Sequence, residues 1–276
     1  MTKLKYTFKN DTLFKMLFVK YPDLLKKLVA VLLGISYDSI THFEIRNPDM
    51  PPESLGDKFC RLDINMTVDG QIVDLEIQVE AEGDYADRTL FYWSKGFSTA
   101  LASGKKYSEL PRMIVISIVA FEMFDCKEYH SEFIPLEVTR HTPLTDKMVM
   151  HYYELLKLPK EVTPDNTLEL WLSLFKAETE EELEKLCALE VLEMSQAVEA
   201  YRHITVTPEF REAERLRSKA RHDEAQALYN AERNRSFEIA KNMIMNNEST
   251  EKILMYTGLS LADLESLRIN NSTTTA

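Results

Sequence analysis

The amino-acid sequence predicts an α/β protein, with a mixed central sheet flanked by helices and followed by an all-α C-terminal region. Alternating apolar and polar residues on both sides of Asp69-Gly70 are typical of an antiparallel hairpin. The order strand, helix, strand that follows is typical of a parallel crossover. After about residue 160 the chain is charged and helix-favouring, without a strand pattern. We therefore expect two parts, residues 1–160 and residues 161–276.

The chain before the hairpin is expected to be mostly helical. Apolar residues recur at helical spacing over residues 11–33, with an interruption near Pro22 and a stop at Gly34. A short strand is expected at Ile40–Ile45. This segment leads toward the first strand of the hairpin.

The Asp69-Gly70 dipeptide sets the register of the hairpin. A type I′ turn needs positive φ at both central residues, and Asp-Gly satisfies that need well. Val68 then pairs with Gln71, and apolar pairs continue along one face as far as Leu62 opposite Ile77. These pairs form the side of the hairpin that we expect to face the core.

The opposite face of the hairpin is polar. It carries Asp63 opposite Glu76 and Arg61 opposite Gln78, and direct cross-strand partners have β-carbons roughly 5 Å apart. Two like charges in this position destabilise the hairpin unless something neutralises them, although a wet surface tolerates such a pair. A divalent cation such as Mg²⁺, which takes carboxylates, water and substrate phosphate as ligands, is the candidate.

The rest of the first part alternates helix and strand. A helix is expected at Tyr85–Ser103, and the next strand, Arg112–Phe121, should lie parallel to the second hairpin strand. Two more strand-like segments follow, His130–Val138 and Met148–Leu156. In the second part, long helical segments are expected at Glu178–Ala200 and Pro208–Asn246.

The C-terminal segment Ser249–Leu267 has a helix–Gly–helix pattern. Such a pair either reads DNA or forms a packing or oligomerising hairpin. Of the formal net charge of -12, residues 161–276 contribute most, with 13 Lys and Arg against 22 Asp and Glu. That acidity disfavours DNA binding by this part and favours a homo-oligomer formed through its helices.

Composition indicates a cytoplasmic protein. The three cysteines, Cys60, Cys126 and Cys187, lack the spacing of a zinc site or of a disulfide framework, which suits a reducing compartment. The N-terminus has no secretory pattern, and the most continuous apolar run, Met113–Phe121, is too short to span a bilayer. We therefore expect no membrane partner.

Several short motifs, taken in order, resemble the recombination-promoting nuclease and transposase family of the PD-(D/E)XK nuclease superfamily. The resemblance runs from about residue 5 to residue 160 and extends loosely into the C-terminal helices. The matching residues are Phe8, Asp11, Phe14, Lys15, Phe18, Arg61, Asp63, Glu76, Gln78, Arg88, Tyr92, Trp93, Ser94, Lys95, Tyr129 and His130. Gln78 stands where most of the superfamily carries Lys, a departure that this subfamily shares.

The resemblance implies a restriction-endonuclease-like core and Mg²⁺-dependent endonuclease activity, a hydrolase of DNA phosphodiester bonds associated with recombination or transposition. Asp63 and Glu76 match the metal carboxylates, and the backbone carbonyl of Ile77 is a third candidate ligand. Gln78 orients water by hydrogen bonding but supplies no charge.

The missing positive charge has three candidate sources. They are Arg61 across the hairpin, and Arg88 and Lys95 on the following helix, where Tyr92 shares their stripe. Asp11 and Lys15 share a face of the first helix and are accessory candidates, although Asp11 is equally suited to a capping role.

Two other readings stay open. One is a catalytically inactive nuclease fold retained as a DNA-binding or assembly module. The other is a glycoside hydrolase that uses Asp63 and Glu76 as acid and nucleophile, but the sequence offers no sugar-binding aromatic platform.

Overall fold

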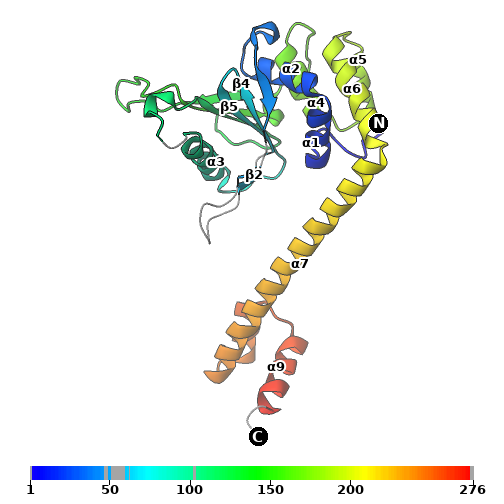
Figure 1. The fold of residues 1–276 in the computed structure, drawn as a ribbon. Coiled ribbons are helices and arrows are strands. Elements are labelled where there is room, and N and C mark those ends of the chain that lie inside the picture. Colours follow the sequence, from blue (N-terminus) through cyan, green and yellow to red (C-terminus); the bar gives the residue numbers. More distant parts are fainter. Residues whose placement is uncertain (1, 47–48, 51–59, 62, 102–103, 274–276) are drawn as a thin grey trace. The chain divides into compact units, whose positions relative to one another are not determined.

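The computed structural model describes residues 2–46, 49–50, 60–61, 63–101 and 104–273. It contains a mixed six-stranded sheet with helices on both faces and a helical C-terminal region (Figure 1), which confirms the predicted fold class. The strand order is β1-β4-β5-β6-β8-β7. The strands are β1 (Phe43–Ile45), β4 (Ile64–Val68), β5 (Gln71–Gln78), β6 (Met113–Val119), β7 (His130–Phe133) and β8 (Met148–Glu154).

The predicted hairpin is β4 and β5. Asp69 has φ 47° and Gly70 has φ 80°, the positive values that a type I′ turn requires. The antiparallel register begins with Val68 opposite Gln71, as predicted, and continues to Ile64 opposite Leu75. The Asp69 carboxylate also accepts hydrogen bonds from the backbone N–H groups of residues 41 and 42, which attaches the turn to the chain before β1.

The predicted pair of Arg61 with Gln78 is wrong. Arg61 belongs to β3 (Cys60–Arg61), which pairs with β2 (Asp49–Met50) in a separate two-stranded sheet, where Arg61 lies opposite Asp49. The ladder between β4 and β5 stops because the chain bends at Asp63, whose side chain accepts a β5 N–H itself. Residue 62, predicted to pair with Ile77, lies outside the described residues.

The predicted parallel crossover is confirmed. The chain leaves β5, passes through α3 (Tyr85–Thr99) and returns as β6, which pairs with β5 in parallel. β8 continues the parallel part beside β6, and β7 closes that side of the sheet as an antiparallel strand. Parallel strands covered on both faces are expected to be almost continuously apolar, and β6 is buried along its whole length.

Several elements are shorter than the sequence suggests. The strand predicted at His130–Val138 ends at Phe133, and the 3-10 turn η3 (Leu155–Lys157) takes the end of the strand predicted at Met148–Leu156. Two further 3-10 turns, η1 (Tyr37–Ser39) and η2 (Tyr107–Glu109), lie outside the predicted strands. The segment Glu178–Ala200 is two helices, α5 (Glu180–Cys187) and α6 (Leu192–Thr205), because the chain turns at Glu190, which has φ 57°.

Local sequence sets the ends of the first helices. Asn10 caps α1 (Asp11–Lys20), since its side chain accepts the N–H of Leu13. Pro22 begins α2 (Pro22–Leu32), a position that tolerates the missing N–H of proline. The capping role that Asp11 could have had therefore belongs to Asn10.

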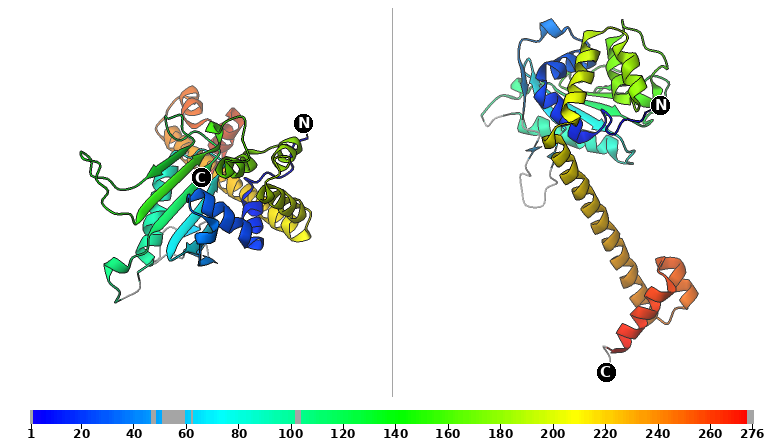
Figure 2. Two further views of the ribbon diagram at one scale, coloured as in Figure 1. Left: turned by 90° about the horizontal axis from the view of Figure 1, so that it is seen from above. Right: turned by 90° about the vertical axis from the view of Figure 1, so that its right-hand side faces the viewer.

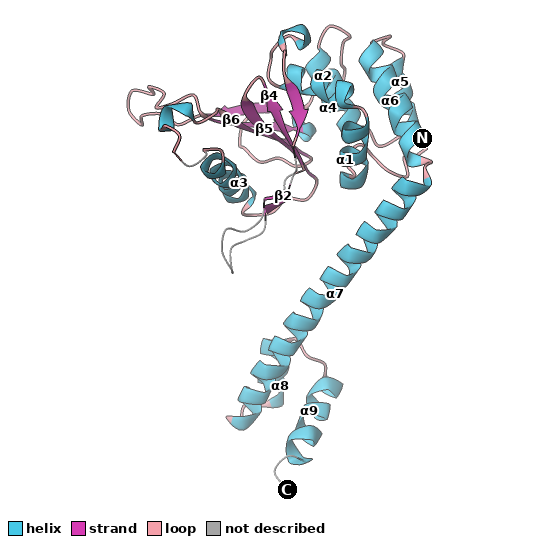
Figure 3. Cartoon of the chain, in the orientation of Figure 1, coloured by secondary structure: helices cyan, strands magenta, loops and turns pink. Residues whose placement is uncertain are grey.

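The two faces of the sheet have separate cores. One face packs against α1, α2 and α4 (Thr167–Lys176), whose aromatic residues Phe14, Phe18, Trp171 and Phe175 are fully buried. The other face packs against α3 (Figure 3). Trp93 and Phe97 of this helix pack against the cluster that contains the buried methionine and valine side chains of β6. Asp74 and Glu76 lie on the α3 side, because they share a face of β5 with Ile72, which belongs to that core.

The chain divides into two compact units, residues 1–211 and residues 212–276. α4 and α6 pack against α2, and α6 also contacts α1 (Figure 2). The first unit therefore extends beyond the boundary that the sequence suggests near residue 160.

The second unit contains most of α7 (Pro208–Met245), together with α8 (Thr250–Thr257) and α9 (Leu261–Thr273). Gly258, with φ 65°, ends α8, so the predicted helix–Gly–helix pattern is confirmed. Ala240, Ile253 and Leu264 form the small core that joins the three helices. None of the helices in the described ranges is both long enough and apolar enough to cross a bilayer.

Candidate active site

The bend before β4 brings Asp63 and Glu76 together. The backbone N–H of Asp63 donates to Oε1 of Glu76 at 3.2 Å, and the N–H of Ile77 donates to Oδ2 of Asp63 at 3.0 Å. The two carboxylates are therefore neighbours through these bonds, and not as partners in the ladder. In an antiparallel strand the N–H and C=O of one residue lie toward the same side, so the Ile77 carbonyl also faces the edge where Asp63 lies.

Burial makes both carboxylates hard to ionise. The pKa of Glu76 rises from its ordinary value of 4.5 to about 8, because burial and then the neighbouring Asp63 disfavour its charged form. Burial also raises the pKa of Asp63, against the opposing effect of Lys15. A cation placed between these groups would offset both effects.

Asp74, which is not among the candidates predicted from the sequence, lies on the same face of β5 as Glu76 and is completely buried. Neither of its carboxylate oxygens has a hydrogen-bond partner among the described residues, and burial raises its pKa well above the ordinary value. The i, i+2 spacing from Glu76 was a visible signal. The sequence did not show that α3 would cover this polar face.

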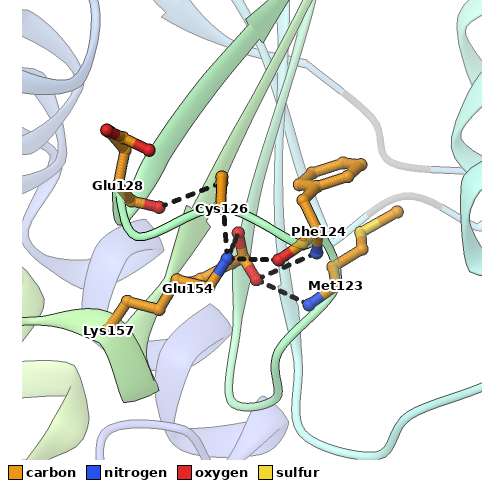
Figure 4. Close-up of polar contacts among 6 residues, drawn as sticks. All are labelled: Met123, Phe124, Cys126, Glu128, Glu154 and Lys157. Carbon is orange, nitrogen blue, oxygen red and sulfur yellow. Dashed lines mark hydrogen bonds and ion pairs between the residues drawn. The ribbon is translucent and has the colours of Figure 1, made fainter.

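Glu154 is a buried carboxylate that, unlike Asp74, has its hydrogen-bond partners within the protein. It is as deeply buried as Asp74, but Lys157 donates to its Oε2 at 2.8 Å, and the N–H groups of Met123 and Phe124 donate to its Oε1 (Figure 4). Its charge and its hydrogen-bonding capacity are satisfied within the protein. The unmet capacity of Asp74 is therefore a property of the hairpin face and not of buried acids in general.

The first helix contributes Asp11 and Lys15 to the site. The Lys15 ammonium lies 2.9 Å from Oδ1 of Asp11 and 3.0 Å from Oδ1 of Asp63. Burial opposes the charged form of Lys15, but the two carboxylates outweigh it and raise the pKa of Lys15 above its ordinary value. Lys15 thus lies in contact with Asp63, and Asp11 holds the ammonium from the other side.

Gln78 and Arg88 form a second contact group at the end of β5. Arg88 donates to Oε1 of Gln78 at 2.9 Å and forms an ion pair with Glu82. The amide nitrogen of Gln78 donates to the Glu80 carbonyl at 2.9 Å and to Glu82 at 3.2 Å. Both ends of the amide are engaged, so its orientation is fixed. Glu82, which holds both partners, had no distinguishing signal in the sequence.

The remaining candidates are placed less directly. Tyr92 and Lys95 lie on α3 beyond Arg88, half-buried, and the Tyr92 ring lies beside that of Phe91. Their part in the site stays a prediction. Arg61 lies on β3 and is not the cross-strand partner of Gln78.

The donor set limits how a metal ion is held. No group of three or more His, Cys, Asp or Glu side chains in the described part of the chain is arranged to hold an ion. A hard divalent cation can be held by two carboxylates, with a carbonyl and water completing its shell. Asp63, Glu76 and the Ile77 carbonyl are donors of those kinds. After burial, the neighbouring Asp63 charge is the next cause of the raised pKa of Glu76, and a cation would relieve that repulsion.

A cavity of about 550 Å³ lies away from these residues. It is where α1 meets α2, and Tyr21, Glu199 and His203 are among the residues that line it. None of the candidate residues lines this cavity, so it has no part in the site built on the hairpin.

Comparison with known proteins identifies one family. The model of a family described as PD-(D/E)XK nuclease family transposase matches residues 8–231. Neither a curated protein nor a solved structure matches the chain. The matched range contains all the elements that carry the candidate residues, from α1 to α3.

Proposed function

Because the chain belongs to the PD-(D/E)XK nuclease family transposases, we propose that it is a metal-dependent DNA endonuclease that hydrolyses phosphodiester bonds during recombination or transposition. The family by itself supports a nuclease- or transposase-related function. The proposal adds the metal dependence, with Mg²⁺ as the expected ion, the internal cleavage of DNA and the residues that carry out the reaction.

The observation that carries the proposal is the hydrogen-bonded pair Asp63 and Glu76. Both acids are largely buried, and both have raised pKa values. A bound divalent ion supplies a Lewis acid for the phosphoryl oxygen and lowers the pKa of a coordinated water. Asp63 and Glu76 would hold the ion through their carboxylates, and Ile77 through its carbonyl.

Gln78 and Arg88 have separate parts in this proposal. The Gln78 amide, fixed by Arg88, Glu80 and Glu82, would orient a water molecule through the second lone pair of its oxygen, although it cannot take up a proton. The Arg88 guanidinium supplies positive charge at the end of β5, where a phosphodiester would lie. We retain Lys95 and Tyr92 as candidates for contacts to the DNA backbone farther along α3.

The direct test is cleavage of supercoiled plasmid DNA by the purified full chain, with Mg²⁺ or with EDTA. We expect nicking with Mg²⁺, no nicking with EDTA, and at least a 100-fold loss for Asp63→Ala and for Glu76→Ala. Asp87→Asn is a matched control, because Asp87 is exposed in the first turn of α3 and is assigned no part in the site.

The alternative to an active nuclease is a DNA-binding protein that has kept the fold. That reading gains support if the wild-type protein binds DNA and does not cut it with Mg²⁺ or Mn²⁺. Cleavage by wild-type protein that persists in Asp63→Ala would reject the site and leave the family assignment intact.

A further inference from the structure

The family name places a lysine two residues after the second carboxylate, and this chain has Gln78 there. A phosphoryl-transfer site needs positive charge beside its metal ligands, because negative charge develops on the phosphoryl oxygens in the transition state. A neutral amide cannot supply that charge. The structure places a lysine from a different element at the carboxylates.

We propose that Lys15, on α1, is the catalytic lysine of this site and contacts the scissile phosphate or the attacking water with its ammonium group. This inference rests on the proposed nuclease function. Lys15 approaches Oδ1 of Asp63 to 3.0 Å, and Asp63 is bonded in turn to the backbone of Ile77. The ammonium thus lies against the first metal carboxylate.

The Lys15 ammonium has spare hydrogen-bonding capacity. It carries three N–H donors, of which two are directed at Asp11 and Asp63. No third acceptor for Lys15 lies within the described ranges of the chain. The third donor can therefore serve a phosphate oxygen or a water molecule without breaking either ion pair.

The position of Lys15 is fixed by the core. Its neighbours on α1, Phe14 and Phe18, are fully buried and pack against Phe175 of α4. Asn10 caps the helix, and Asp11 holds the ammonium from one turn away. Lys15 is about one quarter exposed, enough to meet a substrate.

Arg88 is less suited to the same task. Its two terminal nitrogens bind Gln78 and the Glu82 carboxylate, and its third nitrogen, Nε, is buried, so its charge acts at the end of β5 and on the orientation of Gln78 and not beside Asp63. The two cations therefore divide the work: Arg88 positions the amide, and Lys15 supplies charge beside the Asp63 carboxylate.

The test compares the full chain with Lys15→Met, Lys15→Arg and, as a control on the same helix, Lys20→Met. Lys20 is exposed and lies outside the site. The measurements are the single-turnover cleavage rate of a labelled duplex with Mg²⁺ and the affinity for Mn²⁺ by calorimetry. We expect Lys15→Met to cleave about 100-fold more slowly, as with loss of one transition-state donor, while binding Mn²⁺ as well as wild type or better.

The other variants separate charge from structure. Lys15→Arg should keep a measurable part of the rate, because it retains the positive charge, and Lys20→Met should match wild type. If Lys15→Met fails to fold, the cleavage rates of Asp11→Asn and of Asp11→Asn/Lys15→Met are compared instead. In both of these variants one carboxylate near the position of the ammonium is neutral, so loss of the lysine leaves less unpaired negative charge.

Each other outcome has a definite meaning. If wild-type protein cleaves DNA and Lys15→Met cleaves within threefold of it, Lys15 is not catalytic and the nuclease proposal stands. If Lys15→Met loses Mn²⁺ affinity as Asp63→Ala does, Lys15 only shapes the metal site and the proposal is overturned. If wild-type protein does not cleave with either metal ion, the nuclease function itself fails, and the role of Lys15 fails with it.

Discussion

Replacing Glu76 by Gln should stabilise the metal-free protein at neutral and alkaline pH. The Glu76 carboxyl is buried beside Asp63, and its pKa in the folded chain is about 8. Gln has nearly the same shape and can still accept the N–H of Asp63, but it cannot become charged. The variant therefore removes the cost of ionising a buried acid and little else.

The size of the effect follows from the pKa. Because the folded-state pKa is above the ordinary value of 4.5, the contribution of Glu76 to stability is full below pH 4.5 and is lost as the pH rises toward 8. At about 1.4 kcal/mol per pH unit, the loss reaches up to about 3 kcal/mol at pH 7. Glu76→Gln should recover this amount, and the gain should disappear at pH 4.5.

The assay is urea unfolding of both proteins between pH 4.5 and 8.5, in EDTA and in Mg²⁺. The difference between the two proteins isolates Glu76 from other groups. His130 and His151 have lowered pKa values because they are buried, so they reduce stability as the pH falls, with the opposite sign. Mg²⁺ should stabilise wild type and leave Glu76→Gln unchanged. A variant no more stable than wild type at pH 8 would refute the reasoning.

Three further predictions concern other parts of the chain. Gln78→Lys should lower the cleavage rate about tenfold or more, because the new ammonium meets the Arg88 guanidinium, and Gln78→Lys/Arg88→Met should recover activity. Glu154→Ala should cost about 2 kcal/mol or more in urea unfolding, because it leaves two backbone N–H groups without an acceptor, and cleavage by the folded fraction should persist. Truncation after Arg211, where the first compact unit ends, should lower the oligomeric state in light scattering. It should leave DNA binding at low salt equal, because the removed residues 212–276 hold 9 Lys and Arg against 10 Asp and Glu.

The contrary results are equally specific. An active Gln78→Lys single variant would mean that Arg88 moves away from position 78 without cost. A Glu154→Ala protein as stable as wild type would contradict the structural role given to that carboxylate. A truncated chain that keeps its oligomeric state and loses DNA affinity would make the C-terminal helices the DNA-binding part.

The negative charge of residues 161–276 is not spread evenly over the C-terminal part that the sequence predicts after residue 160. Residues 161–211 hold 4 Lys and Arg against 12 Asp and Glu, whereas residues 212–276 hold 9 against 10. The negative charge thus belongs mainly to α4, α5 and α6 and the segments that join them, within the first compact unit. The second unit is nearly neutral and has no strong charge-based reason to repel DNA.

The sequence by itself determined the hairpin and the crossover. A type I′ turn needs positive φ at its two central residues, and Asp69-Gly70 meets that need without help from the rest of the chain. The alternation of apolar and polar residues then assigns each residue to one face of the hairpin. The turn and the alternation together predict that Asp63 lies near Glu76, and the order strand, helix, strand predicts that β6 is parallel to β5. The predicted pair of Arg61 with Gln78 is wrong, because alternation does not show at which residue a bend ends the ladder.

Only the tertiary structure decided how the polar face of the hairpin is completed. The contact of Lys15 with Asp63 joins α1 to the bend before β4, and the burial of Asp74 depends on α3 covering that face of the sheet. Such contacts come from packing between segments far apart in sequence, and periodicity within one segment carries no information about them. The closeness of Asp63 to Glu76 can therefore be predicted from the turn. The burial of the two carboxylates, their raised pKa values and the contact with Lys15 depend on which helices cover the sheet.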